Sequence, residues 1–476
     1  MIWNISWKNV WRNKSRSMIV ICAVTLGTIS GVFVAGLMKG WVDQRIHNAI
    51  HTEVSHIKIQ NPDYLNNEEL KHTIKNYQKI ESFLNNSKEV KSWTKHSKIV
   101  AMASTSRGST ALILKGIDID EEKKVSDIYT KIVKDGGDYF ESDITNPIVI
   151  SEKTAEQLRL INYIISDKVL DSISVLGINQ QIIEKLAVLK DKRFITEKKF
   201  KTELKNVLSA KEIRKHGAIL LQLAKNYKLR SKIVFTFSGM NNEMSYQSYR
   251  VCGIYKTSNT MFDQMNAFVK HDDIAGVAGI LPGNYHEISI ILNDENESLN
   301  SYNEKLKSNF NDASVLTWKE LSPDAGMMAD FMTIYYYIIM GVIFFALAFG
   351  IINTMLMSVL ERIKELGMLM AIGMNKKRVF NMIMLETIFL TLVGSISGML
   401  IGGALIGVFG TTGLNFSSVQ EGFEAVGWSA IVYPNINLGF FFGVTLMVII
   451  VAILSSIIPA RKALKLNPVE AIRIEM

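Results

Sequence analysis

Four long apolar runs divide this chain of 476 residues. Each run contains about twenty or more mainly apolar residues, which is the length that an α-helix needs to cross a bilayer. The runs cover residues 18–38, 332–360, 379–410 and 437–459. This pattern predicts a membrane protein with four transmembrane helices, and it leaves one long polar stretch between the first run and the second.

The polar stretch, residues 40–330, contains short apolar runs that often alternate with polar positions. Such runs predict half-buried strands. They cover residues 54–60, 111–117, 147–152, 232–237, 249–255 and 286–292. Ser151 stands at the end of the third strand, where its side chain is placed to cap a helix through "TAEQL". We therefore expect a large mixed α/β domain with its own core.

Residues 161–230 depart from the strand pattern. Apolar residues recur there at helical spacing in three segments, and the third begins with the capping-box sequence "SAKE" from Ser209 to Glu212. The region holds fifteen Lys or Arg and seven Asp or Glu. The sequence thus predicts a basic helical insert. Its lysine-rich faces are either simply solvated or form a docking surface for an acidic partner or anionic lipid headgroups.

Basic residues gather on one side of the predicted transmembrane helices. The segments before the first run, between the second and third, and after the fourth carry thirteen Lys or Arg and four Asp or Glu. The connection between the third and fourth runs carries Glu421 and Glu424 and no Lys or Arg. By the positive-inside rule, both termini are predicted to be cytoplasmic and residues 40–330 to lie outside. The net charge of +8 follows from this topology and does not call for a nucleic-acid partner.

The first apolar run follows a basic start and invites comparison with a signal peptide. It is longer than the roughly 7–15 residues of a signal h-region, and no small-residue cleavage site follows it. We therefore expect an uncleaved anchor. The predicted organisation is a cytoplasmic tail at 1–17, a transmembrane helix at 18–39, an extracytoplasmic domain at 40–330, and a module with three transmembrane helices at 331–476.

Two kinds of residue stand out inside the predicted transmembrane helices. Small residues recur at every fourth position in the first and third runs: Gly27, Gly31 and Ala35, then Gly394, Gly398 and Gly402. Such stripes let helices approach closely in lipid, either within one chain or between two chains. Glu386 lies inside the third run, where a charge is costly. It is either a functional group or the partner of a nearby cation such as Lys377.

A short polar segment separates the second run from the third. Its first turns are charged, while Ile363, Leu366 and Met370 keep an apolar face. Gly367 and Gly373 then bracket an almost wholly apolar stretch. The pattern predicts a short amphipathic helix at the cytoplasmic surface. Because it is tied to a transmembrane helix at each end, such a helix is suited to act as a lever.

Several segments of the chain resemble a known family. "ERIKELGMLMAIGMNKKRVF", "MLETIFLTLVGSISGMLIGG" and the closing "PARKALKLNPVEAIR" resemble the permease module of the FtsX/MacB superfamily of ABC transporters. The start of the chain, "SHIKIQNPDY" and "YRVCGIYKTSNTMFDQMNAFV" look most like the lipoprotein-release branch, the LolC/LolE type. The resemblance implies a MacB-like periplasmic core in the extracytoplasmic domain. It offers no counterpart for the insert at 161–230.

The resemblance also implies a permease that works by mechanotransmission and is not itself an enzyme. A separate ATPase subunit would bind ATP and Mg²⁺, and this sequence contains no G-x-x-x-x-G-K-[ST] pattern. No catalytic, cofactor-binding or metal-binding residues are therefore expected in this chain. The positions that match the ATPase-coupling regions of the family are Glu361, Arg362, Ile363, Lys364, Glu365, Leu366, Gly367, Gly373, Pro459, Arg461, Pro468 and Glu470.

The function that the resemblance favours is release of lipoproteins from the bacterial inner membrane to a periplasmic carrier. In that branch a hairpin contacts the carrier, and the matching loop here is 238–248, with Met240 and Met244 as candidate contacts. Two alternatives stay open: a MacB-like tripartite efflux permease with an adaptor, and an FtsX-like regulator of a periplasmic cell-wall hydrolase. Membrane lipids and a second permease, in a homodimer or a heterodimer, are further expected partners.

Overall fold

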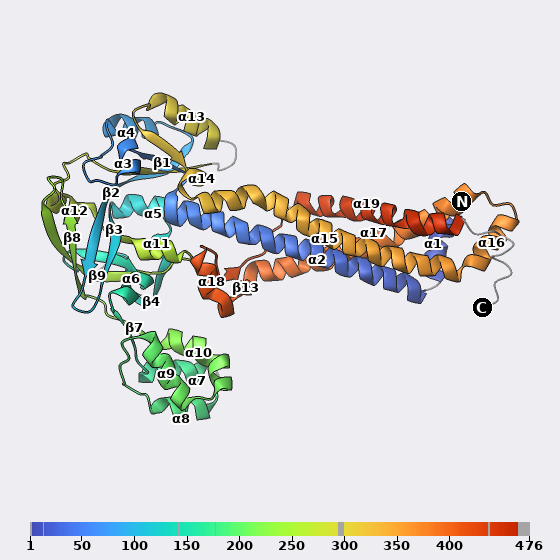
Figure 1. Ribbon diagram of the computed structural model, residues 1–476, viewed down its shortest axis with the longest axis horizontal. Helices are drawn as coiled ribbons and strands as arrows, with labels where there is room; N and C mark the ends of the chain where they lie inside the picture. The colour runs from blue at the N-terminus through green and yellow to red at the C-terminus, as the bar shows by residue number, and fades with distance from the viewer. Residues whose placement is uncertain are drawn as a thin grey trace. The chain divides into compact units, whose positions relative to one another are not determined.

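The computed structural model describes residues 2–12, 14–140, 143–176, 178–293, 299–436 and 438–464. The chain forms two compact units (Figure 1). The helical unit comprises residues 1–46, 327–420 and 429–476, and the α/β unit comprises residues 47–326 and 421–428. Both units are therefore assembled from segments that lie far apart in the sequence.

Helices make up most of the helical unit. They are α1 (Ile2–Arg12), α2 (Lys14–Asn48), α15 (Pro323–Glu361), α16 (Ile363–Ala371), α17 (Lys376–Thr412) and α19 (Leu438–Leu464), accompanied by the paired strands β13 (Leu414–Asn415) and β14 (Ile431–Val432). Among the described residues, three helical stretches are long and apolar enough to cross a membrane: Ser17–Val54, Pro323–Glu361 and Lys376–Thr412. Helix α19 covers the fourth predicted run, and the total of four spans stays a prediction.

Glycines let the long helices of this unit pack closely. A Cβ atom added at Gly398 of α17 would lie 2.6 Å from the Cβ atom of Thr28 in α2. One added at Gly27 of α2 would lie 3.1 Å from a methyl carbon of Leu347 in α15. Both small-residue stripes thus take part in packing within one chain, which is one of the two arrangements that the sequence left open.

A sheet of ten strands forms the centre of the described part of the α/β unit. Its path runs through β12 (Ser314–Thr317), β1 (Ile57–Gln60), β11 (Glu287–Leu292), β2 (Val90–Ser104), β3 (Ser109–Ile117), β10 (Asn266–Lys270), β5 (Pro147–Ser151), β9 (Met244–Tyr255) and β4 (Ile132–Gly137), while β8 (Lys232–Ser238) pairs with β2 and β9. Strands occupy all six regions predicted from the sequence, and the prediction of a mixed α/β core is confirmed. Strand β2 was not predicted, because Lys95, His96 and Lys98 interrupt its apolar alternation.

Short helices connect these strands. They are the π-helix η1 (Ala49–Val54), α3 (Pro62–Asn66), α4 (Tyr77–Asn85), α5 (Ile119–Val125), the 3₁₀ turn η2 (Ile128–Lys131), α6 (Glu152–Gln157), α11 (Thr260–Met265), α12 (His271–Ala278), α13 (Leu299–Asn309), α14 (Trp318–Leu321) and α18 (Gln420–Ala425). Ser151 caps α6 as predicted, since the backbone N–H of Thr154 donates to its hydroxyl oxygen at 3.0 Å.

The predicted insert is a separate group of helices carried on two short strands (Figure 1). Strand β6 (Ile161–Tyr163) pairs antiparallel with β7 (Lys225–Tyr227), and we call this pair the stalk. Between the two strands the structure describes α7 (Asp167–Val175), α8 (Gln180–Ala187), α9 (Glu197–Val207) and α10 (Ala210–Ala224). The capping box at Ser209 is confirmed. Helix α7 adds a segment to the three that the sequence predicted, and the buried side chains of the insert continue the core of the sheet.

Candidate functional site

The predicted lever is a distinct helix, α16, between α15 and α17. Arg362 ends the first helix with backbone angles outside the helical region, φ −101° and ψ 16°. Gly373 ends α16 with φ +101°, a conformation that favours glycine because a side chain would be strained there. Asn375 then caps α17 by accepting a hydrogen bond from the backbone N–H of Lys377 at 3.0 Å. Local sequence signals therefore set both ends of α16.

Helix α16 has one buried face and one exposed face. Leu366 and Gly367 are buried. Lys364 is exposed, Met368 is 53% exposed and Ile372, which follows the helix, is 79% exposed. These three residues are spaced by four positions and so share one face. An exposed face with two large apolar side chains is suited to contact another surface.

Ion pairs hold the start of α16 against its neighbours. The guanidinium Nη1 of Arg362 donates to both carboxylate oxygens of Glu386 in α17, at 3.1 and 3.0 Å. The Arg362 Nε also lies 3.2 Å from Glu365. Glu365 forms a second ion pair with Arg12 of α1 at 2.7 Å. Glu386 is only 5% exposed. The cation that contacts it here is Arg362 and not the Lys377 suggested by the sequence, and a functional role for Glu386 stays a prediction.

The other predicted coupling residues are distributed around this region. Glu361 is exposed at the end of α15, Ile363 is half-buried, and in α19 Pro459 is buried while Arg461 is exposed. Pro468 and Glu470 lie outside the described residues. The structure thus brings the coupling positions of α15 and α16 together around Arg362, and it makes Arg362 a packing residue more than a surface charge.

The predicted carrier loop at 238–248 is the end of the β8–β9 hairpin, and its residues 244–248 belong to β9. Met240 is half-buried and packs on the core of the α/β unit. Met244 is 62% exposed. Tyr246 and Met102, which are also exposed, lie on β9 and on β2, and both of these strands pair with β8. Met244 therefore belongs to an exposed apolar sheet surface and not to a flexible loop.

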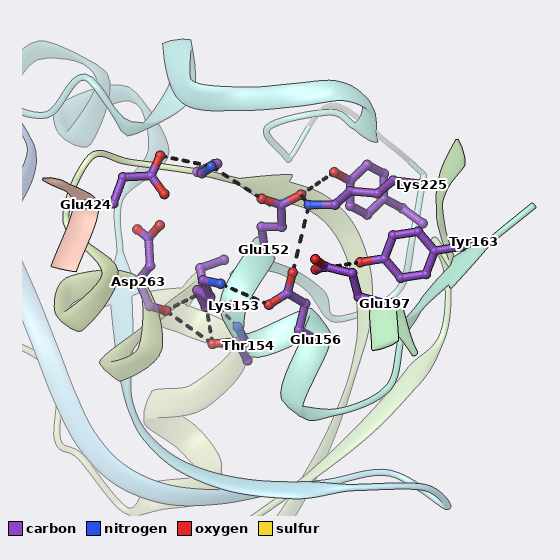
Figure 2. A network of polar contacts seen from close by, with 12 residues as sticks. Glu152, Lys153, Thr154, Glu156, Tyr163, Glu197, Lys225, Asp263 and Glu424 are labelled. Atoms are coloured by element: carbon purple, nitrogen blue, oxygen red, sulfur yellow. Dashed lines mark hydrogen bonds and ion pairs between the residues drawn. The ribbon is translucent and has the colours of Figure 1, made fainter. Parts of the chain in front are cut away.

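A polar network not expected from the sequence lies in the α/β unit (Figure 2). Glu152 at the start of α6 is buried, and its Oε1 accepts from Lys225 Nζ at 2.8 Å and from Tyr227 Oη at 2.6 Å. Lys256 Nζ, at the end of β9, lies 3.9 Å from Glu152 Oε2 and 3.0 Å from Glu424 Oε1. Burial raises the pKa of Glu152, but the charge and hydrogen bond of Lys225 outweigh it, so the pKa is lowered overall.

Asp263 of α11 lies beside this network (Figure 2). Its carboxylate accepts hydrogen bonds from the Thr257 hydroxyl at 2.7 Å and from the Thr257 backbone N–H at 3.1 Å. Burial raises the pKa of Asp263 to about 7, with a further contribution from the negative charge of Glu424. The group therefore changes its charge near neutral pH. No local motif marks it, because the burial comes from the fold.

A second buried cluster joins β1, β2, β11 and α5. Glu287 lies 3.1 Å from Lys58 Nζ, 2.8 Å from Lys98 Nζ and 2.9 Å from His96 Nδ1, and His96 Nε2 lies 2.6 Å from Glu122. Burial lowers the pKa of Lys58 to about 7 against the attraction of Glu287. Within the described residues no group of three or more His, Cys, Asp or Glu is arranged to hold a metal ion. The cluster is a buried network of ion pairs that joins four elements of the unit.

Comparison with known proteins finds a family similar to part of the helical unit. The FtsX-like permease C-terminal family matches residues 337–468. The chain is 29% identical over 235 residues to an uncharacterized ABC transporter permease of Methanocaldococcus jannaschii, covering 48% of this chain and 56% of that protein. It is 27% identical over 189 residues to the uncharacterized ABC transporter permease YknZ of Bacillus subtilis, covering 40% of this chain and 41% of YknZ.

A shorter match joins the chain to MacB of Chlorobium luteolum, a macrolide export ATP-binding/permease protein. It is 37% identical over 129 residues, which is 26% of this chain and 16% of MacB. The chain thus spans about half the length, or less, of the curated relatives it matches. These matches support a relationship to ABC transporter permeases of the MacB and YknZ kind. They do not show that the chain belongs to the lipoprotein-release branch.

Solved structures add a weaker likeness for the α/β unit. The extracellular domain of YknZ is 13% identical, aligned over 55% of this chain and 99% of that domain, with a TM-score of 0.28. The periplasmic region of MacB from Actinobacillus actinomycetemcomitans is 12% identical, aligned over 58% of this chain and 94% of that region, with a TM-score of 0.29. Scores this low do not establish a shared fold, so a MacB-like periplasmic core remains a prediction.

Proposed function

We propose that this chain is the permease subunit of an ABC transporter that works by mechanotransmission. A separate ATPase subunit, which binds ATP and Mg²⁺, docks on the exposed face of α16 formed by Lys364, Met368 and Ile372. That face carries the proposal, because one cation is followed by two large exposed apolar side chains on a helix joined to α15 and α17. The Arg362–Glu386 pair supports it by fixing α16 to α17, so that a push on α16 moves the longer helix as well.

The substrate side of the proposal follows the relatives. The MacB relatives are named for macrolide export, and we propose that this chain likewise serves export and not lipoprotein release. The exposed apolar surface that includes Met102, Met244 and Tyr246 is suited to contact an adaptor or a substrate, because large apolar side chains gather on neighbouring strands. The α/β unit is then extracytoplasmic, and the working permease is a dimer with itself or with a second permease.

The ATPase contact is tested with variants on the exposed face of α16. Ile372→Glu places a charge in the proposed interface and leaves the buried residues of the helix untouched. We expect at least about a ten-fold loss of the ATPase that co-purifies with the tagged chain in mild detergent, since a charge buried without a partner costs well over 1.4 kcal/mol. Val419→Glu is the matched control, because Val419 is also exposed and apolar but lies in the predicted outside connection.

Wild-type recovery of the ATPase with Ile372→Glu would contradict docking on α16. Charge reversal at Arg362 would be a poorer test, because it would place a carboxylate against the buried carboxylate of Glu386. The proposed topology has its own test, in which cysteines are introduced by Lys205→Cys and Lys376→Cys in a chain without Cys22 and Cys252. A membrane-impermeant reagent added to intact cells is expected to label only the first, and labelling of both would contradict the orientation.

A further inference from the structure

The segment 421–428 lies in sequence between α17 and α19 of the helical unit, yet it is part of the α/β unit. Its residue Glu424 is 9% exposed. The Oε1 atom of Glu424 lies 3.0 Å from Lys256 Nζ. A connection between two long helices is thus held to the α/β unit by a buried carboxylate and an ammonium group.

Lys256 faces a second carboxylate, Glu152, whose Oε2 lies 3.9 Å from the same Nζ atom. The other oxygen of Glu152 accepts from Lys225 and Tyr227, which both lie on strand β7 of the stalk. The contacts therefore continue from segment 421–428 through Lys256 and Glu152 to the strands that carry the helical insert (Figure 2). Five residues form this path, namely Glu424, Lys256, Glu152, Lys225 and Tyr227.

Lys225 also has an alternative carboxylate within reach. Its Nζ lies 3.8 Å from Glu156 Oε1, one turn along α6 from Glu152. These distances leave room for a second arrangement with the same charges, in which Glu156, already 3.1 Å from Lys153 Nζ, would also take Lys225. In the arrangement observed here, Lys256 is nearer to Glu424 and Lys225 is nearer to Glu152. In the other, Lys256 moves onto Glu152 and Lys225 moves onto Glu156.

We propose that this network couples the position of segment 421–428 to the local stability of the stalk strands. If Glu424 moves away, Lys256 loses its nearer carboxylate and shifts toward Glu152, because the ammonium group is only 29% exposed and the buried carboxylate of Glu152 already lies 3.9 Å from it. There it competes with Lys225 and Tyr227 for one buried carboxylate. Lys225 then turns toward Glu156, and strand β7 loses a side-chain anchor to α6.

The coupling gives the insert a way to respond to the helices α17 and α19. Any movement that pulls segment 421–428 away from Lys256 loosens the stalk, although Glu424 and the stalk make contact only through the residues between them. Two discrete arrangements of one network are what such transmission requires. The inference concerns the α/β unit alone, so its outcome does not depend on whether an ATPase docks on α16.

Hydrogen exchange of the full chain in detergent, read by mass spectrometry, tests the coupling. Glu424→Gln removes the charge that holds Lys256, and we expect exchange of the stalk amides at 161–164 and 225–228 to rise roughly five-fold, the size of a modest coupling between neighbouring groups. Glu421→Gln is the matched control, since it removes a charge from an exposed position in the same segment and is expected to leave the stalk unchanged.

A second substitution shows whether Lys256 is the link. In a Lys256→Met background, Glu424→Gln is expected to have no further effect on the stalk. Wild-type stalk exchange in Glu424→Gln would overturn the proposal, and so would an effect of the same size in the Lys256→Met background. Exchange in β8 and β9 reports general unfolding. If Glu424→Gln also raises exchange in β8 and β9, the milder variant Glu424→Asp is used instead. That variant must raise exchange in the stalk but not in β8 and β9 for the proposal to stand.

Discussion

The two units of this protein bury charge in different ways. In the helical unit, the guanidinium of Arg362 contacts both oxygens of Glu386 among apolar helices. In the α/β unit, Glu287 is shared by Lys58, Lys98 and His96. The first arrangement fixes one helix to another through a paired contact. The second spreads a buried charge over several partners, so that the loss of one partner leaves others in place.

This difference explains where each unit is rigid and where it can rearrange. A buried carboxylate that loses its cation is strongly destabilised, because the remaining charge is desolvated without compensation. A carboxylate with several cations has alternatives, as Glu152 does with Lys225 and Lys256. We therefore expect removal of Arg362 to disturb Glu386 more than removal of Lys58 disturbs Glu287, which keeps Lys98 and His96.

The largest effect is expected when the Arg362–Glu386 ion pair of the helical unit is removed. Arg362→Met leaves Glu386 buried without the guanidinium and is expected to cost about 3–5 kcal/mol of stability, measured as a loss of thermal stability and of folded protein in detergent. Lys58→Met in the α/β unit should cost less, because Glu287 keeps Lys98 and His96. Lys364→Met at an exposed position is the control. If Lys58→Met proves the more damaging of the two, the contrast between the units is wrong.

A smaller effect is expected where α17 packs against α2. Gly398→Ala places a Cβ atom 2.6 Å from the Cβ of Thr28 and 2.8 Å from the backbone oxygen of Thr25. Overpacking of this kind typically costs about 1–3 kcal/mol. Gly407→Ala on the same helix meets no atom within 4 Å and should be neutral or slightly stabilising. Equal thermal stabilities for the two variants would show that these helices do not pack as described.

The pH dependence of the α/β unit is the next test, through Asp263. Its folded pKa of about 7 lies above the ordinary 3.8, so between these values the folded protein holds a proton that the unfolded chain has released. The resulting stabilisation is complete below about pH 4 and is lost as the pH rises through about 7. Asp263→Asn should therefore flatten the fall in thermal stability over that range. An unchanged slope would mean that Asp263 titrates as an ordinary exposed carboxylate.

Removing the insert tests a function more than it ranks a stability effect. Residues 165–223 can be replaced by a short Gly/Ser linker, because Tyr163 and Lys225 are paired across the stalk and the backbone N–H of Ile164 donates to the carbonyl oxygen of Ala224 at 2.8 Å. This excision keeps Lys225 and Tyr227 in the network around Glu152. We expect a folded, membrane-inserted protein that still retains its ATPase, with thermal stability lowered because the buried side chains of the insert continue the core of the sheet and their removal exposes Leu160 and Tyr163.

The same excision tests the basic faces of the insert. Lys198, Lys199 and Lys211 are exposed on α9 and α10, so binding of an acidic partner or lipid should be strong at low salt and weak at high salt. Pull-down with the intact and the shortened chain at both salt concentrations provides the comparison. Unfolding of the shortened chain would make the insert part of the core, and retention of every partner would leave its faces merely solvated.

The sequence by itself determined the elements of this protein. Continuous apolar runs, period-two strands, the cap at Ser151, the capping box at Ser209 and the turn at Gly373 all appear where local patterns indicate. These features follow from hydrogen bonds and burial within a few residues, so a single sequence contains the information needed to predict them. Helix α7, the strands β2, β4, β6, β7, β10 and β12 and most of the short helices were missed, because short or charge-interrupted segments weaken the same signals.

Only the tertiary structure decided which charges meet. Glu386 pairs with Arg362 of a neighbouring helix and not with Lys377 near the start of its own helix. Segment 421–428 joins the α/β unit through Glu424 although it connects two helices of the other unit. Such pairings depend on where distant backbone segments come to lie, and no spacing along the chain encodes that position. The elements are local, but the partners of buried charges are set by packing between segments far apart in the sequence.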